Sequence, residues 1–320
     1  MARLSEKHKQ ALENAHYEIV GRHSAVEICS WCKKSLLDEG VCYKQKFYGI
    51  NCHRCCQMTP SAGWCDQNCV FCWRAQELNE GIRMDADVDA PKKIVDGCIK
   101  AQIRKLSGFK GNEKTNMEKW KQAQEPMHFA ISLTGEPTLY PKLPKLIKEI
   151  HKREKTSFLV TNGQHPEMLL RLKHENALPT QLYISVDAPT RELHTKIDKS
   201  TNKNAWERLN KTLEILPELN CRKVIRITLI KDMNDCCVSE YAQLLEKAGD
   251  DVMVEVKAYM FIGYSRKRME KENMPTHEEV MEFSKKLAQE LGWNVIDEGV
   301  RSRVVLLAKK DFKSRIMKFN

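Results

Sequence analysis

Short apolar segments alternate with amphipathic segments over most of this chain of 320 residues. The apolar segments, which we expect to form strands, are residues 128–135, 156–163, 181–188, 223–230, 252–260 and 304–310. The amphipathic segments, which we expect to form helices, are residues 92–106, 143–154, 166–175, 204–216, 239–249 and 276–291. Strands that alternate with helices of this length are typical of βαβ units, and strands that are apolar at nearly every position indicate cover on both faces. The pattern predicts an α/β fold, a partial to full (β/α) barrel of the TIM type.

Two further regions lie outside this alternation. Residues 1–27 have apolar positions at helical intervals, so we expect a helix there, and residues 28–75 are rich in cysteine with little periodicity. The polar residues 106–126 predict a surface insertion. We therefore expect an N-terminal extension over residues 1–55, made of a helix and a cysteine-rich segment, and a barrel over residues 56–320 with a basic C-terminal tail.

The cysteine content limits the kind of protein this chain can be. There are 13 cysteines, an odd number, and the first residues lack the apolar core of a secretory signal. Early acidic residues argue against a mitochondrial presequence, and no apolar run approaches the roughly 20 residues that span a bilayer. We therefore expect a cytoplasmic protein that does not bind a membrane. In that compartment cysteine clusters more often hold metal or do chemistry than form disulfides.

Three cysteines lie close together in the segment WCDQNCVFCWR, residues 64–74. Cys65, Cys69 and Cys72 are separated by three and then two residues, so one short loop can bring their thiolates to a single centre. A structural zinc site needs four protein ligands, and a four-iron cluster normally takes four cysteines. Three thiolates leave one iron open to a small molecule. Phe71, just before the last cysteine, would shield such a cluster and pack near a cofactor's base.

This spacing with Phe71 resembles the signature of radical S-adenosylmethionine (radical SAM) enzymes. The segment LTGEPTL, residues 133–139, resembles the family's Gly-Glu-Pro turn, whose backbone and carboxylate hold the methionine amino group of S-adenosylmethionine. The resemblance carries this role to Gly135 and Glu136, while Thr134 stands where the family has its first glycine. An ammonium group needs an acceptor-rich pocket, which a strand end and the Glu136 carboxylate would supply.

Polar residues also follow two other predicted strands. The segments VTNGQ and SVDAP offer Thr161, Asn162, Ser185 and Asp187 to the ribose or carboxylate groups of the cofactor. The active sites of barrel enzymes are built at this carboxyl end of the strands. The alternative is that these four side chains cap the helices that follow. The sequence leaves both interpretations open.

Six cysteines precede the triplet, and two interpretations of them compete. Cys29, Cys32, Cys52 and Cys55 form two Cys-x2-Cys pairs, which match a four-cysteine zinc site. Such a zinc site beside a basic surface would suit RNA binding. The other set is Cys29, Cys42 and Cys55, which recur at intervals of 13 residues.

Together with the triplet, this second set resembles 4-demethylwyosine synthase of the wybutosine pathway, in its archaeal single-domain form. That family carries a second iron–sulfur cluster on three N-terminal cysteines at this wide interval. The resemblance covers nearly the whole chain, including the segments LTGEPTLYP, FLVTNG, YISVDAP and FIGYSR. We therefore prefer a second cluster on Cys29, Cys42 and Cys55, which leaves three neighbouring cysteines without an assigned role (Cys32, Cys52 and Cys56).

The resemblance implies a reaction on tRNA-Phe. The N1-methylguanosine on the 3′ side of the anticodon condenses with pyruvate, which supplies two carbons, to form the tricyclic 4-demethylwyosine. Two [4Fe-4S] clusters and S-adenosylmethionine are the implied cofactors, and a 5′-deoxyadenosyl radical takes hydrogen from the N-methyl group. We recognise no flavin-binding segment, so we expect an external electron donor of the flavodoxin or ferredoxin type.

Pyruvate can be held by the open iron of the second cluster or by a lysine Schiff base. The family is proposed to use a lysine, and by position the resemblance carries this role to Lys155. However, Lys155 precedes the strand 156–163 and is expected at its amino end, away from the catalytic face. Lys257 is the alternative, because a lysine amid the apolar residues of a strand points into the barrel. A Schiff-base lysine must lose its proton near neutral pH, so it needs burial or cationic neighbours.

The net charge of +10 favours a polyanionic partner, which the resemblance identifies as RNA and not DNA. Three basic segments that each contain an aromatic residue are candidate tracks for its phosphates: residues 104–114, 263–271 and 309–319. Two other functions stay open. One is a radical SAM enzyme that acts on a peptide or protein, and the other is a zinc-bearing RNA-binding protein without catalysis.

Overall fold

The computed structural model describes residues 2–319, which build one sheet of ten strands in the order β1-β2-β3-β4-β5-β6-β7-β8-β10-β9. The strands are β1 (Glu18–Val20), β2 (Ser24–Glu27), β3 (Cys55–Thr59), β4 (His128–Ile131), β5 (Thr156–Thr161), β6 (Gln181–Ser185), β7 (Arg222–Leu229), β8 (Val252–Ala258), β9 (Asn294–Gly299) and β10 (Val304–Ala308). Strands β3 to β8 are parallel and adjacent in chain order. This confirms the predicted α/β class with a partial barrel.

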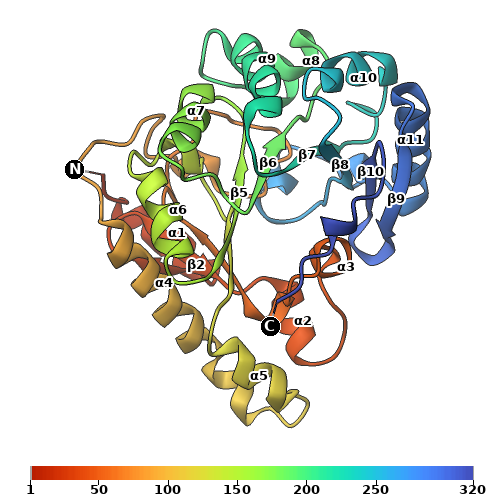
Figure 1. The fold of residues 1–320 in the computed structure, drawn as a ribbon. Coiled ribbons are helices and arrows are strands. Elements are labelled where there is room, and N and C mark those ends of the chain that lie inside the picture. Colours follow the sequence, from red (N-terminus) through yellow and green to blue (C-terminus); the bar gives the residue numbers. More distant parts are fainter. Residues whose placement is uncertain (1, 320) are drawn as a thin grey trace.

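Helices cover the outer face of the parallel strands (Figure 1). All six predicted helices are present, as α4 (Pro91–Leu106), α6 (Leu143–His151), α7 (Pro166–His174), α9 (Ala205–Ile215), α10 (Val238–Glu246) and α11 (His277–Leu291). Helix α1 (Glu6–Asn14) lies within the helix predicted over residues 1–27, and four helices were not predicted, namely α2 (Ser30–Leu36), α3 (Tyr43–Tyr48), α5 (Met117–Ala123) and α8 (Arg191–Asp198). No helix within residues 2–319 combines the length and the apolarity needed to cross a bilayer.

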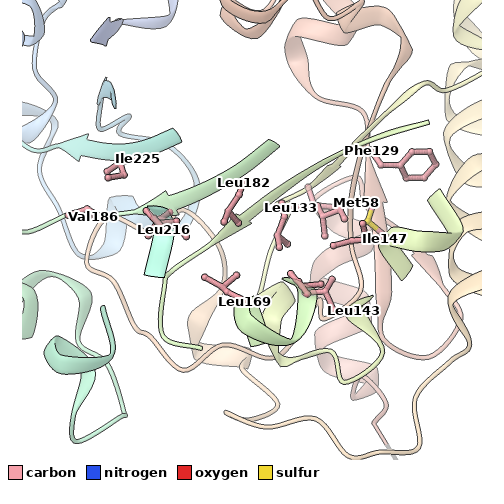
Figure 2. Packing of buried hydrophobic residues seen from close by; sticks show 14 of the residues in the cluster. Met58, Phe129, Leu133, Leu143, Ile147, Leu169, Leu182, Val186, Leu216 and Ile225 are labelled. Atoms are coloured by element: carbon pink, nitrogen blue, oxygen red, sulfur yellow. The ribbon is translucent and has the colours of Figure 1, made fainter. Parts of the chain in front are cut away.

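The main core lies between the sheet and these helices. Leu143 and Ile147 of α6 are one helical turn apart, and their side chains face Met58 and Leu133 (Figure 2). All four side chains belong to one buried cluster that continues along the outer face of the sheet. Each fully buried aliphatic side chain contributes roughly 1.5–3 kcal/mol. This packing holds the parallel strands in place, and with them the carboxyl ends that carry the predicted site.

The predicted helix over residues 1–27 is wrong beyond Asn14. Helix α1 starts after Ser5, whose hydroxyl accepts a hydrogen bond from the backbone N–H of His8 at 3.3 Å. His16 has a left-handed φ of 64°, and the chain then forms an antiparallel hairpin of β1 and β2, with Gly21 at a φ of 62° in its turn. Strand β2 pairs with β3, so this hairpin extends the sheet at its first edge.

The other edge of the sheet also differs from the prediction. Strand β10 confirms a strand within residues 304–310, but it runs antiparallel to β8 and so does not continue the barrel. Strand β9 was missed because its residues are exposed or half-buried, which gives an edge strand no apolar pattern. The parallel part of the barrel therefore ends at β8.

Residues 106–126 are mostly exposed, as their polarity predicts, but they are folded and packed by a few residues. They form the short helix η3 (Ser107–Gly111) and α5, and the Trp120 indole donates a hydrogen bond to the carbonyl of Leu106 at 3.0 Å. Leu106 and Ala123 are fully buried against Ile28 and Leu36 of the N-terminal extension. The segment therefore covers the extension, and its few apolar residues carry that packing.

The interior of the barrel is filled by the N-terminal extension. Phe47 and Tyr48 of α3 are fully buried in a cluster with Phe158 of β5 and Tyr183 of β6. The C-terminal tail lies beside α3, and the backbone N–H of Met317 donates to the Tyr48 carbonyl at 2.9 Å (Figure 1). The extension thus shares its sheet and its core with the barrel, while a domain division at residues 55 and 56 stays a prediction.

Candidate active site

A cavity of about 280 Å³ opens at the carboxyl ends of the parallel strands. The cysteine triplet lines it on one side, and the turn after β4 and the ends of β5, β6 and β7 line it on the other. Every residue that the sequence predicted for the first cluster and for the cofactor lines this one cavity: Cys65, Cys69, Cys72, Phe71, Gly135, Glu136, Thr161, Asn162, Ser185 and Asp187. The structure therefore brings together residues that are spread over more than a hundred positions.

The three thiols of the triplet suit an iron–sulfur cluster. Cys65, Cys69 and Cys72 are half-buried, and burial raises the pKa of each thiol, with smaller contributions from nearby carboxylates such as Glu136 and Asp198. Thiols in such surroundings are neutral until a metal displaces their protons. Three half-buried thiols around one cavity, with no fourth cysteine lining it, match a cluster with an open position.

The turn after β4 lies directly against the cysteine loop. The backbone N–H of Glu136 donates to the carbonyl of Trp64 at 2.7 Å, and the Ser61 hydroxyl donates to the Glu136 carbonyl at 2.9 Å. Gly135 has a φ of 70°, and a Cβ atom there would lie 1.9 Å from the carbonyl oxygen of Ser61. Only glycine fits this position, because any side chain would push the cysteine loop away.

The Glu136 carboxylate is already engaged with protein donors. Its Oε1 accepts from the backbone N–H and hydroxyl of Thr138 at 3.0 and 2.6 Å and from the Thr161 hydroxyl at 2.7 Å. Its Oε2 accepts from the backbone N–H of Asn162 at 2.8 Å. Burial raises the pKa of this carboxyl, while these donors oppose the rise. Glu136 thus joins the ends of β4 and β5, and only Oε2 has room for a further donor.

Asp66, which the sequence did not single out, ties the cysteine loop to other segments by hydrogen bonds. Its Oδ1 accepts from the Asn162 amide at 2.8 Å, and its Oδ2 accepts from the Asn202 amide at 2.7 Å and lies 3.0 Å from His165 Nε2. Burial would raise the Asp66 pKa, but these hydrogen bonds outweigh burial and lower it. No local signal marks this residue, because its partners lie far away in the sequence.

A pair of buried carboxyl groups lies on the β6 side of the cavity. Asp187 accepts a hydrogen bond from the backbone N–H of Thr228 at 2.7 Å, and burial raises its pKa to about 6. Asp198 was not predicted; burial raises its pKa, and the charge of Asp187 raises it further. Asp198 is also in contact with Cys69, and the charges of Asp198 and Asp187 add to the rise in the pKa of the Cys69 thiol.

The segment FIGYSR contacts the chain directly after Cys72, the last cysteine of the triplet. Within η6 (Gly263–Lys267), the backbone N–H of Tyr264 donates to the Trp73 carbonyl at 3.1 Å. The Arg268 guanidinium donates to the carbonyl of Cys72 and, at 3.3 Å, to that of Val70. Arg268 is therefore a positioning residue of the cysteine loop and is not free to bind RNA phosphates.

The second set of cysteines converges on another place. Cys29 directly precedes α2, Cys42 directly precedes α3, and Cys55 is the first residue of β3. All three side chains are half-buried. Burial raises the pKa of the Cys55 thiol, and Cys29 and Cys42 raise it further; Cys29 likewise raises the pKa of Cys42, which reaches about 12. These three thiols are thus electrostatic neighbours although 26 positions separate the first from the last.

Two buried cysteines lie between them in the sequence. Cys32 is fully buried with its Sγ 3.6 Å from the His53 carbonyl, and the buried Cys52 has its Sγ 3.8 Å from the Trp31 carbonyl. Across residues 2–319, no three His, Cys, Asp or Glu side chains surround a point that would hold a single metal ion. Burial raises the pKa of the Cys32 thiol, and the charges of Cys29, Cys55 and Cys52 raise it further, so both cysteine sets lie in this one region and the choice between them stays a prediction.

Comparisons with known proteins agree with this geometry. A model of the radical SAM superfamily matches residues 59–245, and a model described as wyosine base formation matches residues 248–309. The chain is 47% identical over 309 residues to the S-adenosyl-L-methionine-dependent tRNA 4-demethylwyosine synthase of Pyrococcus abyssi, which covers 96% of this chain and 90% of that protein. This chain belongs to the tRNA 4-demethylwyosine synthase family.

Two solved structures are similar to this tRNA 4-demethylwyosine synthase family member over nearly its whole length. TYW1 with a lysine-pyruvate adduct bound has a TM-score of 0.87 and 37% identity, and the match covers 98% of this chain and 99% of that one. An archaeal TYW1 crystal structure has a TM-score of 0.78 and 35% identity, with 96% of each chain covered. The suspected family and the barrel fold are thereby confirmed.

The two predicted lysines of this tRNA 4-demethylwyosine synthase family member lie in different places. Lys155 is at the amino end of β5, with its amine 3.6 Å from Glu125, and it does not reach the cavity. Lys257 is half-buried near the carboxyl end of β8, and its amine donates to the Ser302 carbonyl at 3.2 Å. Burial lowers the pKa of Lys257, and the charge of Arg226 contributes to the same shift; together they bring it to about 8.

A third lysine, Lys44 of α3, was missed by the sequence interpretation. Its amine lies 4.4 Å from the ring centre of Tyr183 inside the barrel. Burial lowers its pKa, and so does the positive charge of Arg226, which lines the cavity. The thiols of Cys42 and Cys55 are also near enough to act on its charge. The signal that could have found it is its place two residues after Cys42.

Proposed function

We propose that this protein is an S-adenosylmethionine-dependent tRNA 4-demethylwyosine synthase. It condenses the N1-methylguanosine on the 3′ side of the anticodon of tRNA-Phe with pyruvate to form the tricyclic base. The observation that carries this proposal is the single cavity lined by the cysteine triplet and the Gly-Glu-Pro turn, in a chain 47% identical to an enzyme of this name. The basic net charge of +10 suits an RNA substrate. The peptide-modifying and zinc-binding alternatives have no comparable support.

Two cysteine sets would each hold a four-iron cluster. Cys65, Cys69 and Cys72 line the cavity and leave one position open, while the second set lies beside Lys44. When bound, the first cluster supplies the electron that makes S-adenosylmethionine reactive. Asp66 and Arg268 hold the triplet loop in place by hydrogen bonds, so the thiols stay at one distance from the turn after β4.

The turn after β4 would hold the methionyl amino group of S-adenosylmethionine. Gly135 lets the turn pack directly against the cysteine loop because it carries no side chain, and the Oε2 atom of Glu136 keeps capacity for one more donor. Phe71 lines the same cavity next to the triplet and offers an apolar face for the adenine. Ser185 and Asp187 line the opposite wall, where they would meet ribose hydroxyl groups.

We propose Lys44 as the residue that forms a Schiff base with pyruvate. A similar protein has been solved with a lysine-pyruvate adduct. Lys155 lies at the amino ends of the strands and pairs with Glu125, so it would have to cross the filled interior to reach the cavity. The amine of Lys257 is held by Ser302. Lys44 lies beside both the second cysteine set and Arg226, which lines the cavity.

The remaining partners follow from the same proposal. An external donor of the flavodoxin or ferredoxin type would supply electrons, and the reaction would take place in the cytoplasm. The basic tail of residues 309–319 is an unsuitable phosphate track, because Phe319 contacts His128 and Arg222 donates to the Ser314 carbonyl, which places the tail at the amino ends of the strands. Residues 104–114 and the exposed part of residues 263–271 remain candidates.

The test is an assay without oxygen. Purified protein, reconstituted with iron and sulfide, is mixed with reductant, S-adenosylmethionine, pyruvate and tRNA that carries N1-methylguanosine. We expect 5′-deoxyadenosine and a tRNA nucleoside with the mass of 4-demethylwyosine. A Cys65→Ala variant should give neither product, whereas a Cys98→Ala variant, altered in the core away from the cavity, should give both. Release of 5′-deoxyadenosine with a peptide substrate but not with tRNA would contradict the proposal.

A further inference from the structure

Arg74 stands at the wall of the cavity with most of its side chain out of solvent. It follows the triplet by two residues, lines the cavity, and its side chain is 12% exposed. Its guanidinium lies 3.4 Å from the ring centre of Trp73 and 4.9 Å from that of Tyr17. Its Nη1 donates to Glu27 Oε2 at 3.3 Å. The proposed function assigns no role to the positive charge of Arg74.

Two of its N–H-bearing nitrogens lack a partner. Nε and Nη2 of Arg74 are buried, and neither meets a hydrogen-bond acceptor in the part of the chain that the structure describes. The aromatic rings stabilise the positive charge but offer no lone pair to these N–H groups. A buried donor without an acceptor costs roughly 1–3 kcal/mol, and more when it is charged. The ion pair with Glu27 provides an acceptor for Nη1 of the guanidinium and not for the other two nitrogens.

Nε and one Nη of an arginine form the edge that binds a planar anion through two parallel hydrogen bonds. On Arg74 this edge is the unpaired one. We propose that Arg74 binds the carboxylate of a small substrate inside the cavity. This inference rests on the proposed function, because that reaction brings two small carboxylates to this site, the methionyl carboxylate of S-adenosylmethionine and the carboxylate of pyruvate.

A phosphate of the RNA backbone is a poorer occupant of this site. Arg74 is enclosed by Tyr17 and Trp73, and its unpaired nitrogens are buried, so a polymer backbone cannot approach them as it approaches a surface arginine. Arg74 lines a cavity of about 280 Å³, which has room for a small carboxylate. Glu27, the ion-pair partner, also acts on the charge of Cys29, so Arg74 lies between the two cysteine sets.

The test compares each substrate with an analogue that lacks its carboxylate. Isothermal titration calorimetry without oxygen measures the Kd of S-adenosylmethionine and of decarboxylated S-adenosylmethionine, and the Kd of pyruvate and of pyruvamide. Variants are Arg74→Met, Arg74→Lys and, as a control, Arg266→Met, an exposed arginine of η6. We expect R74M to weaken one carboxylate ligand by about tenfold to a hundredfold, the loss of a charge-assisted hydrogen-bond pair.

The specificity readout separates binding from a structural role. In R74M the preference for that ligand over its analogue should disappear, R74K should keep part of it, and R266M should keep all of it. The arm that changes identifies the source of the carboxylate. If R74M binds both ligands as tightly as the wild type and keeps both preferences, Arg74 binds no carboxylate and the inference is wrong.

A second variant covers a failure to fold. If R74M is unstable because it leaves Glu27 unpaired, the double variant R74M/E27Q removes both charges, and the same calorimetry applies to it. The inference can also be separated from the proposed function. Failure of the wild type to modify tRNA would overturn the function, whereas the carboxylate preference of Arg74 is measured by binding alone.

Discussion

At the scale of single residues, the lysines show what local sequence cannot decide. Lys155 was chosen by its place before a strand, and Lys257 by its apolar neighbours within one. Lys44 carries no such mark, because its surroundings come from Tyr183 and Arg226, which are far away in the sequence. The chemistry of a lysine depends on its burial and on nearby charges, and both are properties of the folded chain.

The first prediction concerns the pyruvate adduct. We expect wild-type protein treated with borohydride and labelled pyruvate to retain label on Lys44, because this amine is buried beside cationic and aromatic neighbours. Lys44→Ala should abolish labelling, and Lys155→Ala should leave it unchanged. Peptide mapping by mass spectrometry identifies the labelled residue. Label that persists in K44A and disappears in Lys257→Ala would assign the role to Lys257.

The second prediction concerns stability and pH. Burial lowers the pKa of Lys257 to about 8, whereas an unfolded lysine titrates near 10.4. Between these values the unfolded chain binds more protons, so the contribution of Lys257 to the free energy of unfolding rises with pH. The advantage of Lys257→Met over the wild type should therefore shrink by roughly 3 kcal/mol from pH 7 to about pH 10. Urea unfolding at several pH values measures it, and a difference independent of pH would contradict it.

At the scale of elements, the short segments around the cysteines were the hardest to predict. Helices α2 and α3 are too short to show a helical period, and strands β1 and β2 have three and four residues. Their positions follow from what they cover. Helix α3 fills the barrel, and β2 pairs with β3. The long helices and parallel strands were predictable because each repeats its pattern over several turns or pairs.

The third prediction concerns the number of clusters. We expect the reconstituted wild type to hold about eight irons per chain, four in each cluster. Cys29→Ala, Cys42→Ala or Cys55→Ala should each lower this to about four, since each removes a ligand of one cluster only. Cys32→Ala is the matched control, because its thiol faces the core, and should keep all the iron. Loss of iron in C32A with retention in C42A would support the other cysteine set.

The fourth prediction concerns the contact between η6 and the cysteine loop. Gly263 has a φ of 56°, and a Cβ atom there would lie 2.5 Å from the Trp73 carbonyl. Gly263→Ala should therefore displace Trp73 and Cys72 and cost about 1–3 kcal/mol. Calorimetry should show weaker binding of S-adenosylmethionine, and thermal unfolding a lower Tm. Gly108→Ala, where a Cβ atom meets nothing within 4 Å, should change neither.

At the scale of the whole molecule, one sheet joins the extension and the barrel. A net charge of +10 attracts a polyanion without specifying where it binds. Several basic side chains are not available for that purpose. Arg268 holds the cysteine loop, and Arg222 and Arg315 hold the tail at the amino ends of the strands.

The fifth prediction concerns salt. If tRNA is held mainly through its phosphates, its affinity should fall by roughly tenfold or more between 50 and 200 mM salt, because bound counterions are released. The affinity for pyruvate should change far less, since its proposed site beside Lys44 is inside the barrel and less screened by salt. Filter binding with tRNA and calorimetry with pyruvate provide the two measurements. A tRNA affinity that does not depend on salt would contradict a phosphate-based contact.

The sequence by itself determined the α/β class, the parallel strands and the two cysteine sets, because hydrophobic periodicity and cysteine spacing are local properties of the chain. Only the tertiary structure decided that α3 fills the barrel, that Asp66 is bonded to Asn162 and Asn202, and that Arg74 lines the cavity. The physical reason is the same in each case. Burial, hydrogen-bond partners and neighbouring charges come from segments that meet only when the sheet closes around them.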